Sequence, residues 1–433
     1  MEVTEGALKK NNGEIVVGFD LSDSFSQISY GYVEGTDVDT LSTVAGTQNY
    51  LVPTALFKRR EVNQWYVGRE AIKNAGEDGI FIDKLLTRAR AGEEVKVSDE
   101  SFRPVSLLSL FMKRTLTLVN MVAPVTRIAA FMVTVDELDT RMVEILSEAV
   151  SSLGLKTENI FFQSHMESFY YYMTNQPAEL WQRNVLLLDF SESFLKTYRM
   201  ECNNNTTPIV AFIDPMGYPT FSTAELKETV PDSAEGSALD TGLLEIVSNI
   251  SEGRIFSSVY LIGDNFSKDC FKETLKLLCR KARVFEGNNL YSKGAAFSAR
   301  NKIFKTILSE SYVFLGNDKL KSNIGMNVYK RGEKAYLALL DAGINWFEAS
   351  RECDVYLDQG NKLSFVITPL TGKNPEVVDI TLEDLPKRPA RTTRLHISVK
   401  MNSESKMAVN VKDMGFGELF PAGNVEWNEV IDV

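Results

Sequence analysis

Two aspartates, Asp20 and Asp189, each follow a short apolar run and precede a turn rich in serine. The first stretch, residues 14–28, is EIVVGFDLSDSFSQI, and the second, residues 184–200, is NVLLLDFSESFLKTYRM. An acid at a strand tip followed by small residues is one way to hold a metal–phosphate group over a hairpin. The alternative is a core strand that ends in an ordinary Asp/Ser turn. A single stretch of this kind leaves both interpretations open.

The two stretches share one plan, which is an apolar strand, an aspartate, a small turn and a returning strand. Continuous apolar runs of this length are typical of strands buried on both faces. The repetition predicts an internally duplicated α/β protein in which two hairpins face each other. A ligand phosphate would then lie between the hairpins.

Other elements must position these hairpins. Residues 27–33 alternate between apolar and polar types, which predicts the strand that returns from the first turn. Asp136 is expected to cap the helix that follows it, and His165 is expected to be a hydrogen-bonded loop residue rather than a catalyst. The remaining elements expected in this part are a helix at 104–119, strands at 128–135 and 160–162, and a helix at 167–173.

The region after the second aspartate has fewer regular patterns. Residues 259–262 predict a strand that ends at Gly263-Asp264-Asn265, and a helix follows it. Residues 292–307 are small and helical in character. A strand at 209–213 and a helix at 242–251 are also expected.

The helical period disappears after about residue 333. Apolar and polar residues alternate along residues 394–401 and 407–411, with a hairpin turn expected at 402–405. Residues 341–433 therefore predict an antiparallel β-sandwich domain.

The bulk properties exclude several classes of protein. A chain of 433 residues predicts two or three domains. The net charge of −11 argues against nucleic acid as a main partner, because phosphate binding needs clustered cations. Four scattered cysteines and two histidines argue against a metal site and fit a reducing cytosol. We expect no signal peptide and no membrane span, hence a cytoplasmic protein.

The order of these parts resembles the seventy-kilodalton heat-shock chaperone family, within the actin-like ATPase superfamily. VVGFDLSDSFSQI and NVLLLDFSESF resemble the two phosphate strands of that family. VYLIGDNFSKDCFKETL resembles its adenosine strand and helix, and AYLALLD resembles its interdomain linker. ITLEDLPKRPARTTRLHISVKMNSESKMAVNVKD resembles the end of its β substrate domain. The series of motifs, rather than any single one, carries the resemblance.

The resemblance implies a duplicated actin-like ATPase fold, with two lobes around a nucleotide cleft, followed by the β-sandwich. It also implies the domain boundaries. We expect a flexible tail at 1–12, lobe I at 13–184, a shortened lobe II at 185–332, a linker at 333–342 and a substrate-binding-like domain at 343–433. The helical lid of the family is expected to be missing.

The departures from the family concern chemistry. Ser22 stands where the family has a glycine whose backbone approaches the phosphates, and Asp23 adds a negative charge beside it. Glu192 would repel an anion, whereas Lys196 would attract one. Ser164 replaces the catalytic glutamate, with Glu167 one turn away. The implied nucleotide-binding residues are Asp20, Ser22, Ser24, Asp189, Ser191, Ser193, Gly263 and Asp264, and the implied catalytic residues, if the site is active, are Asp20, Lys84 and Asp189.

These departures predict a chaperone-like protein of weak or absent ATPase activity that acts by binding a protein or peptide through its β domain. ATP or ADP with magnesium would be held weakly. One alternative is an ATP-driven chaperone with a site rebuilt from Asp20, Ser24, Lys84 and Asp189. Another is an actin-like filament or scaffold protein. A sugar-kinase-type enzyme fits the superfamily but does not fit the C-terminal β domain.

Overall fold

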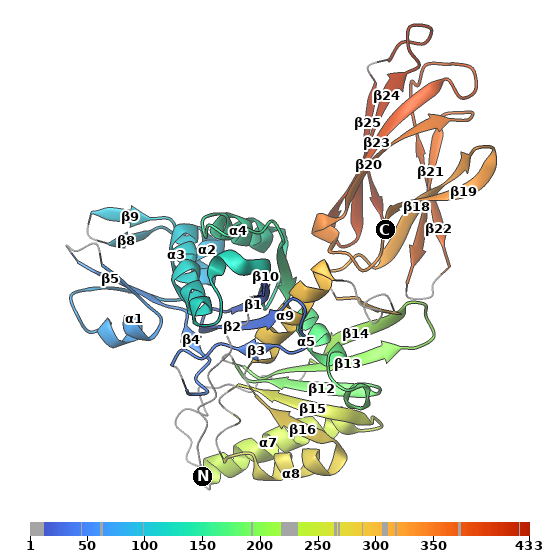
Figure 1. The fold of residues 1–433 in the computed structure, drawn as a ribbon. Helices are drawn as coiled ribbons and strands as arrows, with labels where there is room; N and C mark the ends of the chain where they lie inside the picture. The colour runs from blue at the N-terminus through green and yellow to red at the C-terminus, as the bar shows by residue number, and fades with distance from the viewer. Residues whose placement is uncertain are drawn as a thin grey trace. The chain divides into compact units, whose positions relative to one another are not determined.

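The fold is mixed α/β, with antiparallel sheets in the C-terminal part. The chain divides into two compact units (Figure 1): unit 1 comprises Met1–Asn203 and Ala211–Tyr312, and unit 2 comprises Asn204–Val210 and Val313–Val433. The structure is a computed structural model that describes residues 13–44, 46–60, 64–97, 99–191, 194–217, 233–263, 266, 269–287, 289–304, 311–316, 318–370, 374–423 and 425–433.

The first sheet of unit 1 is built on β1 (Ile15–Leu21), whose apolar side chains are buried on both faces. Its strand order is β11-β10-β1-β2-β3, and β4 also pairs with β2. β1 runs parallel to β10 and antiparallel to β2, and β10 runs parallel to β11. The other bounds are β2 (Phe25–Tyr32), β3 (Asp39–Thr40), β4 (Val52–Pro53), β10 (Ile128–Val135) and β11 (Ile160–Ser164).

The second sheet repeats this arrangement around β12 (Asn184–Asp189). Its order is β16-β15-β12-β13-β14-β17, with β12 antiparallel to β13 and parallel to β15, and β15 parallel to β16. The strand order and these directions match those of the first sheet. The other bounds are β13 (Lys196–Asn203), β14 (Ile209–Pro215), β15 (Phe256–Ile262), β16 (Arg283–Glu286) and β17 (Tyr312–Phe314).

Helices cover the sheets in a matching way. In Figure 1, α3 (Pro104–Leu116) and α4 (Thr140–Ser151) lie outside the first sheet, and α7 (Ala234–Ser251) and α8 (Lys272–Lys281) lie outside the second. Two helices lie between the sheets and cross, namely α5 (His165–Thr174) and α9 (Leu290–Ile303). We call β1 to α5 the first half of unit 1 and β12 to α9 the second half.

Each crossing helix packs on the sheet of the other half. Ala295 and Ala299 of α9 share a core cluster with Val16 of β1, and Phe169 of α5 meets Tyr260 of β15 edge-on. The approach is close because α9 carries small residues: a Cβ on Gly294 would lie 1.9 Å from the Ser168 carbonyl oxygen. The two halves are therefore tied together along this crossing.

Short elements fill the rest of the first half. Three strands form a small antiparallel sheet beside the first one, and a two-stranded ribbon precedes α3. These elements are β5 (Leu56–Arg59), β6 (Trp65–Val67), α1 (Arg69–Asn74), β7 (Gly79–Ile82), α2 (Leu85–Ala91), β8 (Val95–Val97) and β9 (Glu100–Phe102); short 3-10 helices are Thr117–Met121, Val125–Arg127, Ala178–Leu180 and, in unit 2, Trp346–Glu348.

Unit 2 contains two four-stranded antiparallel sheets, in the orders β19-β18-β21-β22 and β20-β23-β24-β25. Alternate residues of β23 and β24 are buried in a shared core, as the alternation in the sequence predicts. The bounds are β18 (Ser322–Lys330), β19 (Glu333–Leu340), β20 (Ser350–Leu357), β21 (Lys362–Pro369), β22 (Glu376–Thr381), β23 (Thr393–Ser403), β24 (Lys406–Gly415) and β25 (Glu426–Asp432).

Two expectations about the elements are wrong. The linker expected at 333–342 is mostly strand β19, which pairs with β18, so the C-terminal sheets start earlier than residue 343. The apolar run AYLALL is a strand because it pairs with β18, and this pairing is not visible in the run itself. The cap of α4 is Asp139, whose side chain accepts a hydrogen bond from the Met142 amide, and not Asp136. Among the helices that the structure describes, none has the length and apolar character needed to cross a membrane.

Candidate functional site

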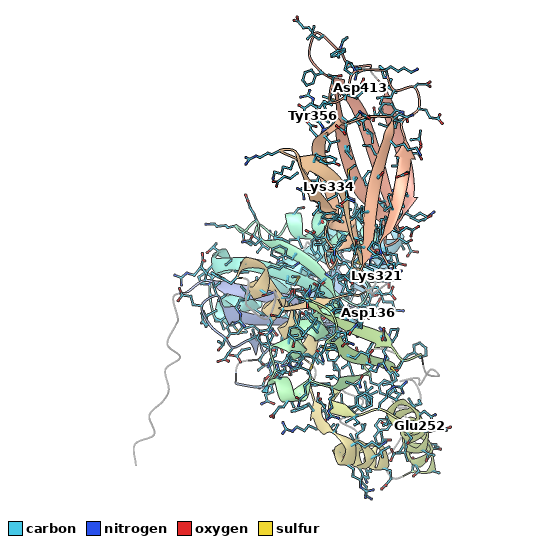
Figure 2. The ribbon with its side chains drawn as sticks, turned by 90° about the vertical axis from the view of Figure 1, so that its right-hand side faces the viewer. Asp136, Glu252, Lys321, Lys334, Tyr356 and Asp413 are labelled. Carbon is cyan, nitrogen blue, oxygen red and sulfur yellow. The ribbon has the colours of Figure 1, made fainter. Side chains whose placement is uncertain are left out.

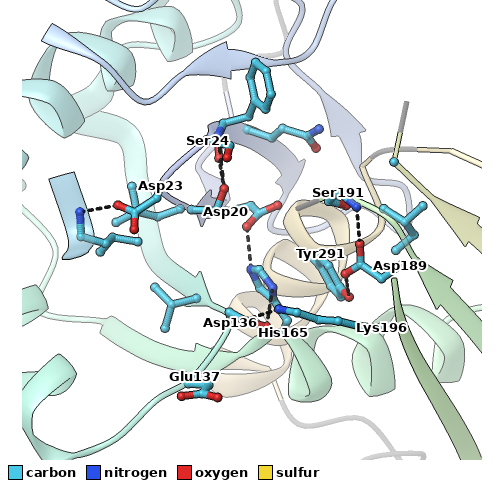
Figure 3. Close-up of a pocket in the computed structure, with 18 of the residues that line it drawn as sticks. Asp20, Asp23, Ser24, Asp136, Glu137, His165, Asp189, Ser191, Lys196 and Tyr291 are labelled. Atoms are coloured by element: carbon cyan, nitrogen blue, oxygen red, sulfur yellow. Dashed lines mark hydrogen bonds and ion pairs between the residues drawn. The ribbon is translucent and has the colours of Figure 1, made fainter. Parts of the chain in front are cut away.

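A cavity of about 630 Å³ lies where the tips of β1 and β12 meet. Both aspartates that the sequence singles out line it. Figure 3 shows Asp20 and Asp189 with four further side chains between them, Asp136, His165, Lys196 and Tyr291. The structure thus brings the two predicted strand tips together, and it places a set of charged and aromatic groups between them.

Asp20 is paired with a histidine. The His165 imidazole Nε2 lies 2.8 Å from the Asp20 carboxylate, and both side chains are mostly buried. His165 is the first residue of α5, which Ser164 caps by accepting a hydrogen bond from the Glu167 amide. Burial is the largest influence on the pKa of His165 and lowers it, but Asp20, Asp136 and Asp189 together outweigh it and raise the pKa. The surrounding carboxylates therefore favour the protonated form of the imidazole.

Asp136 follows the end of β10 and continues this arrangement. It forms an ion pair with Lys196, the first residue of β13, and its other carboxylate oxygen lies 3.8 Å from Nδ1 of His165. Burial would raise the pKa of Asp136, but the two cations lower it below its usual range. Lys196 is therefore bound to a carboxylate of the first half, rather than available as the anion-attracting group expected from the sequence.

Asp189 is held in a different way. Tyr291 of α9 donates a hydrogen bond of 2.6 Å to one carboxylate oxygen, and the Ser191 amide donates one of 2.9 Å to the other. Burial, then the charge of Asp189, raise the pKa of Tyr291 well above its usual value, so the phenol stays protonated as a donor. The Tyr291 ring stacks on the His165 ring, with centroids 4.1 Å apart. The two aspartates are thus linked through a stacked His–Tyr pair.

The first turn uses its polar groups internally. The Ser22 amide and hydroxyl both donate to the Phe25 carbonyl, at 3.2 and 2.8 Å. Asp23 accepts hydrogen bonds from the backbone amides of Leu86 and Thr87 at the start of α2, and from the Thr87 hydroxyl. The expectation that Asp23 repels a bound phosphate is therefore replaced by a local role, because its charge satisfies a helix N-terminus. Ser24 lines the cavity.

The second turn is shaped by Gly263, which follows β15 and lines the cavity. Its φ is +105°, and a Cβ there would lie 2.4 Å from the backbone of Phe190. The glycine thus permits β15 to approach the end of β12. Ser191 also lines the cavity, with its amide turned to Asp189. Ser193, Asp264 and Glu192 lie outside the described residues.

The proposed catalytic lysine is placed elsewhere. Lys84 precedes α2 with a left-handed backbone, φ 52°, and lines a neighbouring hollow with Ser24, Phe25 and Thr87. The basic residue that α2 contributes to the cavity is Arg90, which is paired with Asp139. The structure therefore brings Asp20, Ser22, Ser24, Asp189, Ser191 and Gly263 to one cavity and leaves Lys84 outside it.

The groups that the resemblance assigns to a magnesium nucleotide are engaged within the protein. Asp20 and Asp189, the two carboxylates that the resemblance assigns to it, already have protein partners at 2.6 to 2.9 Å. The amides of Ser22 and Ser191, one from each turn, point to protein oxygens rather than into a phosphate cradle. In the part of the chain that is described, no group of three or more His, Cys, Asp or Glu side chains is placed to hold a metal ion.

Three residues of this site were missed as site residues in the sequence, namely Asp136, His165 and Tyr291. Asp136 and His165 follow the carboxyl ends of β10 and β11, which lie parallel to β1. Carboxyl ends of parallel strands meet at one edge of a sheet, so these positions could have been placed beside Asp20. Tyr291 carried no such signal, because its place depends on how α9 crosses from the other half.

Comparisons with known proteins identify two domain families, and neither family has a known function. Residues 319–433 match a domain of unknown function, DUF8552. No curated protein matches the chain. Residues 37–317, more than half of the chain and most of unit 1, match the C-terminal part of a family of unknown function, DUF5716. The chain therefore belongs to the DUF5716 family.

Proposed function

We propose that unit 1 is a divergent actin-like ATPase fold, related to the seventy-kilodalton heat-shock chaperones, whose ATPase activity is weak or absent. The observation that carries this proposal is a repeated arrangement of two sheets. The sheets have the same strand order around β1 and β12, and the aspartates near the ends of these two strands line one shared cavity. Duplicated strand order with acids at matching tips is what the resemblance implies for a two-lobed nucleotide cleft.

The weak or absent turnover follows from the partners of the two aspartates. Asp20 already has His165 as its partner at 2.8 Å, and Asp189 already accepts hydrogen bonds from Tyr291 and from the backbone. A nucleotide would have to displace these partners before it could bind its magnesium ion there. Each lost charge-assisted contact costs about 1.5–3 kcal/mol, so several losses are enough to remove micromolar affinity.

Unit 2 would then supply the activity, as a module that binds protein or peptide. Its support is a group of large apolar side chains exposed near one end of the two sheets. Phe416 is 45% exposed and Leu419 is 82% exposed, and Tyr356 meets Phe416 edge-on. Exposed apolar groups gathered in one place are typical of interaction surfaces.

Calorimetric titration with Mg-ATP tests the first part of the proposal, together with a phosphate-release assay. We expect no resolved heat and no turnover above buffer, with an active chaperone ATPase run in parallel as the positive control. Micromolar binding with robust turnover would overturn the pseudo-ATPase assignment and favour the ATP-driven chaperone with a rebuilt site. Nucleotide-dependent sedimentation of the full chain would instead favour the filament alternative.

Suppression of aggregation tests the second part. An unfolded reporter protein is diluted into the full chain, and light scattering is followed. We expect scattering to fall in the presence of the chain and to recover with Phe416→Ser and Leu419→Ser combined. Ile72→Ser, which changes an exposed apolar residue on α1 of unit 1, is the control and should leave suppression intact. Equal suppression by all three proteins would reject this surface.

A further inference from the structure

The two halves of unit 1 are joined at the cavity by contacts between side chains. Asp20, His165 and Asp136 come from the first half, and Lys196 comes from the start of β13 in the second. We call these four residues the charged chain, since carboxylates and basic side chains alternate along it. A second contact runs beside it, because His165 of α5 stacks on Tyr291 of α9.

The charged chain connects the two halves at the tips of β1 and β12, whereas the crossing of α5 and α9 connects them along the helices. α9 is pressed against β1: a Cβ on Gly18 would lie 2.3 Å from the Ser292 carbonyl oxygen and 2.4 Å from the Ala296 amide. Such backbone-to-backbone contact leaves little room for sliding. Opening of the cavity would therefore pivot on the crossing and separate Lys196 from Asp136.

We propose that the charged chain is a built-in latch that keeps the cavity closed without any ligand. This deepens the proposed function and rests on it, because the latch takes the place that a bridging nucleotide would occupy. Carboxylates and basic side chains alternate along Asp20, His165, Asp136 and Lys196, and the ion pair of Lys196 with Asp136 joins the two halves.

The ion pair that joins the halves is also the most exposed contact of the charged chain. The side chains of Lys196 and Asp136 are 32% and 46% exposed, whereas those of His165 and Asp20 are 8% and 13% exposed. Solvent screens a half-exposed pair more strongly than a buried one. Breaking Lys196 from Asp136 thus opens the latch while leaving the buried Asp20–His165 pair in place.

Amide hydrogen exchange of the full chain, without ligand, tests the latch through Lys196→Met. We expect exchange of the segments 133–138 and 194–199 to accelerate about threefold to fivefold, the effect of losing a partly exposed ion pair. Exchange in α5 and α9 should stay unchanged. The matched control is Lys276→Met, which removes a lysine paired with Glu273 on the surface of α8. Equal exchange in the variant and its control would overturn the latch.

High salt gives a second measurement that requires no substitution. In 1 M NaCl the same two segments of the native chain should exchange faster, and Lys196→Met should show no further acceleration. A salt response that persists in Lys196→Met would contradict the latch. A further sample with Mg-ATP distinguishes the latch from the proposed function. Slower hydrogen exchange with the nucleotide would count against the proposed pseudo-ATPase, whereas the latch is judged from the ligand-free samples alone.

Discussion

Each unit contains a buried acid paired with a base, and the two pairs are built differently. In unit 1 Asp20 meets His165 at a cavity, in a chain of four charges contributed by separate elements. In unit 2 Asp413 of β24 meets Arg388 in the loop before β23, and neither side chain is more than 5% exposed. The first pair faces a cavity and the second is enclosed.

Asp413 has its full set of donors. Arg388 donates two hydrogen bonds of 2.7 Å to its two oxygens, and the amides of Gly415 and Gly423 donate one each. Arg388 also donates to the Pro421 carbonyl. The pair therefore holds the loop between β24 and β25 against the loop before β23. Figure 2 shows Asp413 and Tyr356 toward one end of unit 2 and Lys321 toward the other.

The comparison separates charges that stabilise a fold from charges that control a site. Asp413 fixes a surface loop. Because the backbone amides of Gly415 and Gly423 already bind its carboxylate, no other group can easily take the place of Arg388. The pairs at the cavity join side chains from separate elements, and one of these pairs is partly exposed. We expect loss of an Asp413 contact to cost global stability and loss of a cavity contact to cost mainly local closure.

Arg388→Met should produce the largest effect. The substitution leaves the Asp413 carboxylate buried without its cation, and breaking such a pair costs about 3–5 kcal/mol. Hydrogen exchange in β23 and β24 reports the unfolding free energy of unit 2 within the full chain. The control is Arg391→Met. Arg391 and its partner Asp358 both have exposed side chains, so hydrogen exchange in β23 and β24 should be unchanged in this variant. A small effect at Arg388 would remove the distinction between the two pairs.

Gly294→Ala tests the support of the cavity charges. The added Cβ would lie 1.9 Å from the backbone oxygen of Ser168, so α9 must shift away from α5 and take Tyr291 with it. Overpacking of this kind costs about 1–3 kcal/mol, which thermal unfolding of unit 1 would report. Gly76→Ala is the control, because a Cβ there meets nothing within 4 Å. Equal stability of both variants would show that the crossing is looser than the structure indicates.

The elements were more predictable than the site. Alternation along β23 and β24, and apolar runs along β1 and β12, arise from burial of side chains and are visible in the sequence. The strand β19 was mistaken for a linker because its identity depends on pairing with β18. Pairing between strands is a property of two segments together, so one segment read alone does not reveal it.

The site was predictable where a residue ends a strand and unpredictable where its partner comes from elsewhere. Asp20 and Asp189 were found from the strands that precede them. The roles of Asp23 and Lys196 were misjudged, since the helix N-terminus that Asp23 caps and the carboxylate that Lys196 binds come from distant parts of the chain. A charged side chain that would repel a ligand in an isolated motif does not do so when a partner in the fold compensates its charge.

Acid should weaken unit 2 through Asp413. Hydrogen bonds from Arg388, then from the amides of Gly415 and Gly423, lower the pKa of Asp413 from 3.8 to about 2, against the opposing effect of burial. The resulting stabilisation is present above pH 3.8 and is lost as the pH falls toward 2, a change of about 2 kcal/mol. Urea unfolding between pH 5 and 2 measures it. Asp413→Asn should lack this component, and an identical slope in that variant would assign acid sensitivity to other carboxylates.

Alkali should weaken unit 1 through His165, by a smaller amount over the range that is easily measured. Because the pKa of His165 is raised above 6.5 in the folded chain, its stabilisation is full below pH 6.5 and is lost as the pH rises through the folded-state pKa. One proton corresponds to at most about 1.4 kcal/mol per pH unit. His165→Gln should flatten the pH dependence of unit 1 stability above pH 6.5.

The titration itself can be observed, because the chain has only two histidines. In His396→Gln the remaining imidazole signal in the proton NMR spectrum belongs to His165, and its midpoint gives the pKa directly. A midpoint above 6.5 is required if Asp20 and Asp136 hold the ring as a cation. A midpoint below 6.5 would mean that burial outweighs the carboxylates, and the cavity would then contain a neutral histidine and an unbalanced Asp20, unlike the fully matched pair at Asp413.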